Sequence, residues 1–501
     1  MTVQDAYGRL IAALRQQHDL AAALHLLEWD QETCMPAGVL DARARQIGLL
    51  ATLLHRQQTD PAFLALVDEL AERHTELDAA QGVDVRETKW RVDRRRRLPE
   101  ALVRERSMLH AEARGVWIEA RRTDDFARLA PLLTRIVELA RAVAAAIDAT
   151  RDPYDVLLEA YEPGASVADL EPLFGTLRDG LLPLVERLNE RLARRPLHLS
   201  ALCGDFAVDA QRRFNRAVVE LLGFDCARGR IDEAAHPFTI SIGDDVRLTT
   251  RYDPGDLRYA LYATIHETGH GLYEQGVDAD AWGTPRGEAC SLGVHESQSR
   301  LWENHVGRSP GFWRQLLPMA RRFFPVLANT SLDAILLAVN AARPSLIRTE
   351  ADELTYNLHI ILRFELERAL LDGALGVADL PASWRAKMQQ YFGVVPASDR
   401  DGVLQDVHWS CGDIGYFPTY TLGNIYAAQL MQAAEVSLGP IDALLGSGNC
   451  GELLRWLRTH VHRLGRTYRA AELIERATMA APSPRALLAH LEQRLAFLES
   501  V

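Results

Sequence analysis

The chain has 501 residues, of which 48% are hydrophobic and 25% are charged, and this composition is that of an ordinary soluble globular protein. Its net charge of −12 argues against a nucleic-acid or anionic-membrane partner, since both attract basic surfaces. No apolar stretch reaches the roughly 18 uncharged residues of a membrane helix, and the polar start, MTVQDAYGRL, lacks the apolar core of a secretory signal.

The cysteines are scattered along the chain, and no two of them form a CxxC pair. This distribution is typical of reduced, structural cysteines, so we expect a cytoplasmic protein without a disulfide framework. Any metal would then be held by histidine and carboxylate side chains, since thiolate sites use clustered cysteines. The six positions are Cys34, Cys203, Cys226, Cys290, Cys411 and Cys450.

Residues 1–225 are predicted to form successive amphipathic helices, because apolar residues recur at intervals of three and four and prolines separate the segments. The pattern changes near residue 236. Two β-prone runs, 238–242 and 246–252, flank the turn sequence Gly-Asp-Asp and predict a hairpin. From residue 285 to the end the pattern is helical again, so we expect a single, mainly α-helical domain with a small β-ribbon at 236–252.

A helix is expected directly after the ribbon, with Asp253 as N-cap, Pro254 at its first position and Gly276 as C-cap. This helix contains the sequence IHETGHGLYEQG, in which His266 and His270 are four residues apart and share one face. Two imidazoles so placed can bind one Zn²⁺, and the intervening glutamate can act as a general base. The alternative is a pair of core histidines satisfied by ordinary hydrogen bonds.

A catalytic zinc site with two histidines needs a third protein ligand. The pattern HExxHxxGxxH is excluded, because Tyr occupies position 273 and Gly occupies position 276. A carboxylate from the following segment, 287–307, must therefore complete the site, and Glu288, Glu296 and Glu303 are available. Spacing does not separate the last two, since they are seven residues apart on one helical face.

Two further segments carry polar residues at suggestive positions. In an expected helix over 346–368, five polar residues recur at helical spacing, which suits either a functional stripe or a solvent-exposed face. The segment 402–424 carries His408, Tyr416 and Tyr420, and aromatic packing is the alternative role for the two tyrosines. The stripe comprises Arg348, Asp352, Thr355, His359 and Arg363.

Together these segments resemble the carboxypeptidase Taq family of HExxH zinc metallocarboxypeptidases. The resemblance extends over the whole chain, and no motif position departs from the family pattern. It implies a gluzincin-like helical fold with a long substrate groove, and it selects Glu296 as the third ligand. The matching strings, in chain order, are LEWDQETCMP, HPF, DVRLT, HETGH, GVHESQSRLWEN, IRTEADELTYNLH, GVLQDVHWS and GYFPTYTLGN.

The resemblance also implies an activity, namely removal of C-terminal residues from peptides with broad specificity but poor release of proline, commonly by a homodimer. Zn²⁺ is the expected cofactor, although Co²⁺ or Mn²⁺ can occupy such a site. In the domain 1–501, residues 1–225 would form a wall of the cleft. Residues 253–424 would supply the active-site helices and substrate-binding segments, and 425–501 the C-terminal helices.

Roles follow for the remaining candidates. Zinc would activate a water molecule, Glu267 would accept its proton, and Tyr420 or His408 would stabilise the oxyanion. An arginine suits recognition of the substrate's α-carboxylate, because its planar fork donates two parallel hydrogen bonds. Arg348, the arginine of the family's IRxxAD segment, is the first choice, and the expected substrate-binding residues are Arg348, Arg247, His236 and Tyr416. An endo-acting zinc oligopeptidase is the alternative function, and a non-enzymatic helical scaffold is a third.

Overall fold

Helices form most of the ordered elements, so the prediction of a mainly helical fold with a small sheet is confirmed. The structure is a computed structural model that describes residues 2–195, 197 and 200–500. Among the described residues, no helix is both long enough and apolar enough to cross a membrane. The chain divides into two compact units, the first comprising Met1–Asp93, Leu199–Val339 and Leu430–Met479, and the second comprising Arg94–His198, Asn340–Gln429 and Ala480–Val501.

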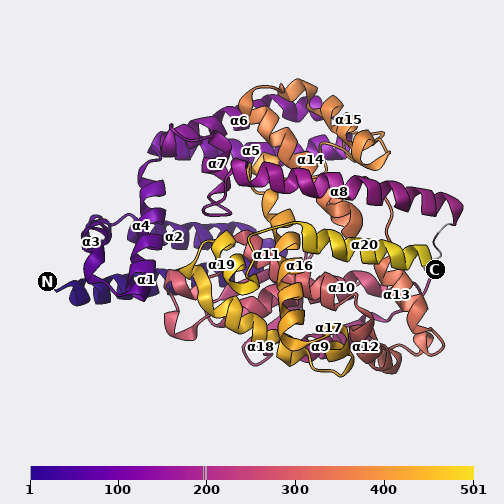
Figure 1. Cartoon of the computed structure of the whole chain (residues 1–501). Helices are drawn as coiled ribbons and strands as arrows, with labels where there is room; N and C mark the ends of the chain where they lie inside the picture. The colour runs from indigo at the N-terminus through magenta and orange to yellow at the C-terminus, as the bar shows by residue number, and fades with distance from the viewer. Residues whose placement is uncertain (1, 196, 198–199, 501) are drawn as a thin grey trace. The chain divides into compact units, whose positions relative to one another are not determined.

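The first unit contains the N-terminal helices, the sheet and the helix that carries the HETGH sequence (Figure 1). In chain order its helices are α1 (Val3–Thr33), α2 (Leu40–Gln58), α3 (Pro61–Glu72), α4 (Ala79–Arg96), α9 (Val208–Leu222), α10 (Leu257–Glu274), α11 (Leu292–Arg300), the π-helical segment η5 (Leu301–Val306), α12 (Pro310–Phe323), α13 (Leu332–Asn340), α17 (Ile441–Gly446), α18 (Cys450–His460) and α19 (Ala470–Thr478).

The sheet has three strands in the order β1-β3-β2, with β1 (Gly229–Glu233), β2 (Thr239–Ile242) and β3 (Asp245–Thr250). The strands β2 and β3 are antiparallel and form the predicted hairpin. The strand β1 pairs in parallel with β3 and was not expected from the sequence. The charged segment that forms β1 has little β-propensity of its own, so its conformation depends on the pairing with β3.

Helix α10 is the central element of the first unit and packs against α9, α11, η5, β2 and β3. Most of its residues are buried, among them the apolar residues Leu261, Ile265 and Leu272. The sheet packs closely on it, since a Cβ atom at Gly271 would lie 2.8 Å from the Leu248 side chain on β3. This extensive burial identifies α10 as the core helix of this unit.

The ends of α10 differ from the prediction. Asp256, and not Asp253, is the N-cap, and its side chain accepts a hydrogen bond from the backbone N–H of Arg258. The Asp253 side chain instead accepts a bond from the N–H of Gly255 within a turn that precedes the helix. At the other end the C-cap is Gln275 and not Gly276. Two aspartates stand in one short turn, and each can cap local N–H groups, so the pattern alone favoured the wrong one.

The second unit is an assembly of long helices in which α14 packs against α6, α7, α8, α15 and α20 (Figure 1). The expected helix over 346–368 begins later, at Glu353, because Asp352 caps it through bonds from the N–H groups of Leu354 and Thr355. Arg348 lies in a separate 3₁₀ turn, η7 (Arg348–Glu350). The other helices are α5 (Glu100–Thr123), α6 (Phe126–Asp148), α7 (Pro153–Leu158), α8 (Val167–Arg194), α14 (Glu353–Asp372), α15 (Leu380–Phe392), α16 (Pro418–Leu438) and α20 (Arg485–Ser500).

Candidate metal centre

The two histidines of α10 meet one glutamate of α11. His266, His270 and Glu296 each direct one ligand atom into a cluster in which these atoms lie within 4.8 Å of one another. The Nε2 atoms of His266 and His270 are 3.7 and 3.5 Å from Glu296 Oε2. Donor atoms of a tetrahedral zinc site, with bonds of about 2.0–2.1 Å, are roughly 3.4 Å apart. The spacing therefore fits a divalent metal with small adjustments.

The ionisation of the cluster also suits a metal. Burial alone would raise the pKa of Glu296, but Arg300 and the two histidines hold that pKa well below its usual range. The Glu296 side chain is therefore an ionised carboxylate, as a ligand must be. Burial and the neighbouring His295 lower the pKa of His270 to about 3, so its imidazole is neutral and can donate a lone pair. Nitrogen and carboxylate donors of this kind are those that zinc prefers.

A glycine allows α10 and α11 to approach closely enough to form this cluster. A Cβ atom at Gly269 would lie 2.6 Å from both the carbonyl oxygen of Gln298 and the Cα atom of Ser299. Both contacts are with backbone, which cannot move aside as a flexible side chain can. Gly269, between the two histidines, therefore brings Glu296 within reach of their imidazoles.

The other two candidate ligands have different partners. Glu303 Oε2 accepts a hydrogen bond of 2.9 Å from His266 Nδ1, on the ring edge away from Nε2, and Glu303 also binds Arg300 and Arg308. A carboxylate in this position fixes the orientation of a metal-binding histidine. Glu288 binds Arg91 and lies outside the cluster. The geometry thus separates the roles of Glu296 and Glu303, which the spacing left open.

Glu267 lies beside the cluster and is held by the sheet. The hydroxyl of Thr239, on β2, donates to Glu267 Oε2 at 2.6 Å and also contacts the backbone oxygen of Glu267 at 3.0 Å. Burial raises the pKa of Glu267 above its usual range, against the opposing effects of His266 and Thr239. A raised pKa makes the ionised carboxylate a better proton acceptor. Thr239 was not singled out in the sequence, because only the β2–α10 packing gives it this contact.

Arg247 and His236 lie outside the cluster. Val246 and Leu248, on either side of Arg247, are buried, and Leu248 faces α10. Because side chains alternate along a strand, Arg247 projects from the opposite face of the sheet. There its guanidinium lies 4.0 Å from the ring centre of Trp29 on α1, and it donates to Asp245. His236 is exposed in the segment between β1 and β2.

The second unit brings together its own set of the expected residues. Arg348 donates to Asp406 Oδ1 through Nε at 2.9 Å and Nη2 at 2.7 Å, while Arg363 donates to Asp406 Oδ2 through Nε at 2.7 Å. Both arginines are buried, so the stripe that could have been a solvent-exposed face is interior. The guanidinium groups hold the pKa of Asp406 below its usual range in spite of burial. Two guanidinium groups around one carboxylate leave an excess positive charge.

Three aromatic side chains form a cluster beside that charge. The Arg348 guanidinium carbon is 5.0 Å from the ring centre of Tyr420, and the Tyr420 hydroxyl is 3.4 Å from His408 Nε2. The ring of Tyr416 lies 5.4 Å from that of Tyr420 and 5.3 Å from that of His408. Burial lowers the pKa of His408 to about 4, so this imidazole is neutral at pH 7 and does not change the excess positive charge. The structure therefore groups Arg348, His408, Tyr416 and Tyr420, which are distant in the sequence.

The loop that carries these aromatic residues is anchored by a buried glutamate. Glu367, on α14, accepts hydrogen bonds from the Tyr154 hydroxyl at 2.8 Å, from Trp409 Nε1 at 2.8 Å and from the Gly415 N–H at 3.1 Å. Burial nevertheless raises the pKa of Glu367 to about 7. Because the folded chain retains this proton above the unfolded-state pKa near 4.5, the group's contribution to stability falls as pH rises between about 4.5 and 7.

We therefore expect Glu367→Gln to flatten the dependence of stability on pH in that window. Between pH 4.5 and 7 the free energy of unfolding of the wild type should fall by about 3 kcal/mol more than that of the variant, since each unit of pKa shift corresponds to about 1.4 kcal/mol. Urea denaturation of both proteins at half-unit intervals of pH would measure this difference. The matched control is Glu365→Gln on the same helix, which removes a carboxylate that Arg178 binds. Parallel profiles for wild type and Glu367→Gln would contradict the assignment.

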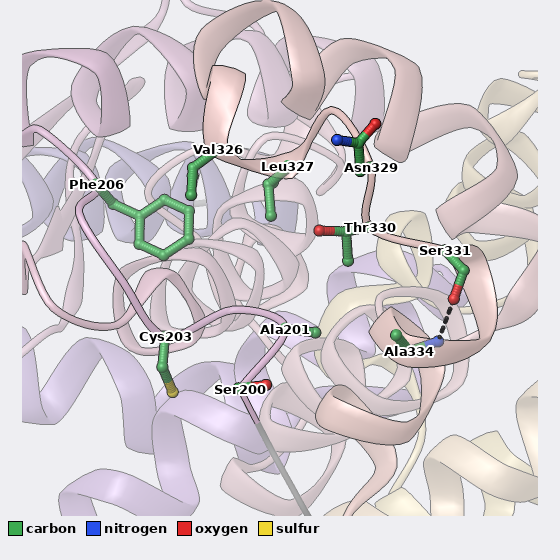
Figure 2. A pocket seen from close by; sticks show the side chains of 10 residues that line it. All are labelled: Ser200, Ala201, Cys203, Phe206, Val326, Leu327, Asn329, Thr330, Ser331 and Ala334. Atoms are coloured by element: carbon green, nitrogen blue, oxygen red, sulfur yellow. Dashed lines mark hydrogen bonds between the residues drawn. The ribbon is translucent and has the colours of Figure 1, made fainter.

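The first unit also has a surface pocket with a volume of about 370 Å³ (Figure 2). Figure 2 shows the Ser331 hydroxyl accepting a hydrogen bond from the backbone N–H of Ala334 at its rim. Among the residues that the structure describes, none of the expected site residues lines it. Its described lining residues are Ser200, Ala201, Cys203, Phe206, Val326, Leu327, Asn329, Thr330, Ser331 and Ala334.

Comparisons with known proteins agree with the geometry. A family model described as carboxypeptidase Taq (M32) metallopeptidase matches residues 9–495. Thermostable carboxypeptidase 1 of Thermus thermophilus is 45% identical over 99% of this chain and 100% of its own length, and carboxypeptidase 1 of Bacillus subtilis is 37% identical over 96% of both chains. The crystal structure of an M32 carboxypeptidase from Deinococcus radiodurans has a TM-score of 0.96 at 40% identity, covering 99% of this chain and 100% of that one.

Proposed function

Because the chain belongs to the carboxypeptidase Taq (M32) family of metallopeptidases, we propose that it is a zinc-dependent carboxypeptidase that removes C-terminal residues from peptides. The observation that carries the proposal is the His266–His270–Glu296 cluster, whose donor types and spacing suit a divalent metal. The relatives are named carboxypeptidases, so the alternative of an endo-acting oligopeptidase is not favoured.

In this proposal His266, His270 and Glu296 hold the metal, which would supply Lewis-acid activation of water and of the scissile carbonyl. Glu267 accepts the proton of the attacking water and passes it to the leaving amine. Its hydrogen bond from Thr239 fixes the carboxylate, and burial favours proton uptake by it. The donor set is that of zinc peptidases, although Co²⁺ and Mn²⁺ also bind nitrogen and carboxylate ligands.

The second cluster is proposed to act on the substrate. Tyr420 and His408 stabilise the oxyanion as hydrogen-bond donors, with Tyr420 the first choice. Arg348 binds the α-carboxylate, and the excess positive charge around Asp406 supports this role. Tyr416 completes the aromatic wall beside Tyr420.

We keep Arg247 and His236 as substrate-binding candidates with weaker support, since Arg247 already pairs with Asp245 and Trp29. The strand β2 lies at the edge of the sheet, so a substrate backbone can add to it as a further strand.

The proposal keeps the remaining expectations drawn from the family resemblance. These are broad side-chain tolerance with poor release of proline, a cytoplasmic location, a homodimeric state and a single catalytic domain over residues 1–501. The six cysteines all lie within the described residues and form no disulfide there, which is consistent with a reducing compartment. The unbroken family match from residue 9 to residue 495 supports the single domain.

A pair of peptides that differ only in a C-terminal acid or amide tests the proposal. We expect kcat/KM to be about 10–100-fold higher for the acid, because charge-assisted hydrogen bonds to a carboxylate contribute about 1.5–3 kcal/mol. Arg348→Lys keeps the charge but loses the planar fork, so it should reduce this preference while leaving metal content unchanged. Mass spectrometry of the products identifies the bond that is cut. Equal cleavage of acid and amide by the wild type would remove the carboxypeptidase assignment.

A further inference from the structure

The two candidate metal-binding histidines are oriented in different ways. His266 has a carboxylate behind it, since its Nδ1 atom donates to Glu303 at 2.9 Å. His270 has no equivalent partner, because its Nδ1 atom is shielded from solvent and makes no hydrogen bond with any described residue. A metal-binding imidazole without such a bond is free to rotate unless packing fixes its plane.

A third histidine supplies that packing. The ring of His295, which directly precedes Glu296 on α11, stacks on His270 with centroids 4.4 Å apart and planes 15° apart. His266 meets His270 edge to face, with centroids 4.9 Å apart and planes 82° apart. His270 therefore has one ring stacked on it and another perpendicular to it. The face contact with His295 restricts rotation of the His270 ring about its χ2 angle.

His295 is itself held in place from α10 and the sheet. Its Nε2 atom lies 2.8 Å from Glu274 Oε1, and Glu274 Oε2 accepts a bond of 2.9 Å from the Ser241 hydroxyl on β2. Glu274 stands one turn beyond His270 on α10, so the stacked ring is tied back to the helix that carries the ligand. Burial alone would raise the pKa of Glu274, but the hydrogen bonds from His295 and Ser241 keep that pKa below its usual range. The anchor is therefore an ionised carboxylate.

We propose that His295, anchored by Glu274, is a positioning residue that fixes the imidazole plane of His270 and so sets the affinity and geometry of the metal site. His295 replaces, through ring stacking, what Glu303 provides to His266 through a hydrogen bond. The inference rests on the proposed function, because it assumes that His270 binds the metal. It gives a structural role to His295, the first residue of the segment His295-Glu296-Ser297, whose second residue is the proposed ligand.

Metal affinity and the visible absorption spectrum of the Co²⁺-loaded protein test the proposal without reference to activity. His295→Ala should raise the dissociation constant for Zn²⁺, measured by competition with a chelator, by about 10–100-fold, as loss of a supporting contact to a metal ligand does. It should also change the Co²⁺ spectrum, which reports ligand geometry. His295→Phe keeps a flat ring but loses the bond to Glu274, so its affinity should lie between those of His295→Ala and the wild type. Glu274→Gln should also lie between those two, since it keeps the stacked ring and weakens only its anchor.

His462→Ala is the matched control. His462 is a buried histidine that bonds Gln298 at 2.9 Å and packs against Tyr273, yet it touches no ligand of the cluster. Its loss should lower thermal stability and leave both metal readouts unchanged. Wild-type affinity and an unaltered Co²⁺ spectrum in His295→Ala would overturn the inference, and if that variant does not fold, wild-type values in Glu274→Gln would do so. A wild-type protein that takes up no metal would instead overturn the proposed function.

Discussion

Glu267→Gln should lower kcat by about 10²–10⁴-fold while the protein still binds one equivalent of metal, because a positioned general base contributes a factor of that size. The amide has the shape of the carboxylate and can still accept the hydrogen bond that Thr239 now donates at 2.6 Å. It cannot take up a proton. Since Glu267 is outside the His266–His270–Glu296 cluster, its replacement leaves the three donor atoms in place. Steady-state kinetics and metal analysis of the same preparation would measure both effects.

The matched control is Glu220→Gln, the same chemical change at an exposed residue of α9 that pairs with Arg216. This variant should keep the wild-type kcat and metal content. If Glu267→Gln retained more than about a tenth of the wild-type kcat, Glu267 would not be the general base. If it lost the metal as well as the activity, the experiment would show that Glu267 supports the site and would leave no evidence for proton transfer by it.

The two histidines of α10 could be predicted because the information is local. Positions four apart on a helix share a face in any tertiary context, and the structure places His266 and His270 accordingly. The hairpin was predictable for the same reason, since two β-prone runs flank a turn sequence. The third strand, β1, was not, because its backbone is satisfied only by pairing with β3 and its own residues do not favour a strand.

The different contacts of Glu296 and Glu303 are not encoded in their spacing. Both carboxylates lie beside His266, as a shared helical face predicts, yet they approach different nitrogen atoms of its ring. The helix changes from α to π between them, at the junction of α11 and η5. Family resemblance selected Glu296, whose Oε2 atom lies 3.7 and 3.5 Å from the Nε2 atoms of His266 and His270. In the same way, Asp406 stands 58 residues beyond Arg348, and only the fold shows that it joins Arg348 to Arg363.

Replacing Glu296 should affect metal binding more than replacing Glu303. This order follows from the nitrogen atoms that each carboxylate approaches. Glu296→Ala removes the oxygen that lies 3.5–3.7 Å from both Nε2 atoms, so the site keeps two protein donors and should hold no stoichiometric metal after dialysis. Glu303→Gln removes the charge that orients His266 through Nδ1, and loss of such a partner typically weakens metal binding by about 10–100-fold. Equilibrium dialysis against buffered Zn²⁺ would measure both variants.

Glu288→Gln completes the comparison, because it tests the last of the three glutamates that the sequence offered as ligands. Glu288 binds Arg91 and lies outside the cluster, so this variant should bind metal with wild-type affinity. A greater loss in Glu303→Gln than in Glu296→Ala would mean that Glu303 is the ligand and that His266 binds through Nδ1. The donor set would then be different, although α10 and α11 would still carry it.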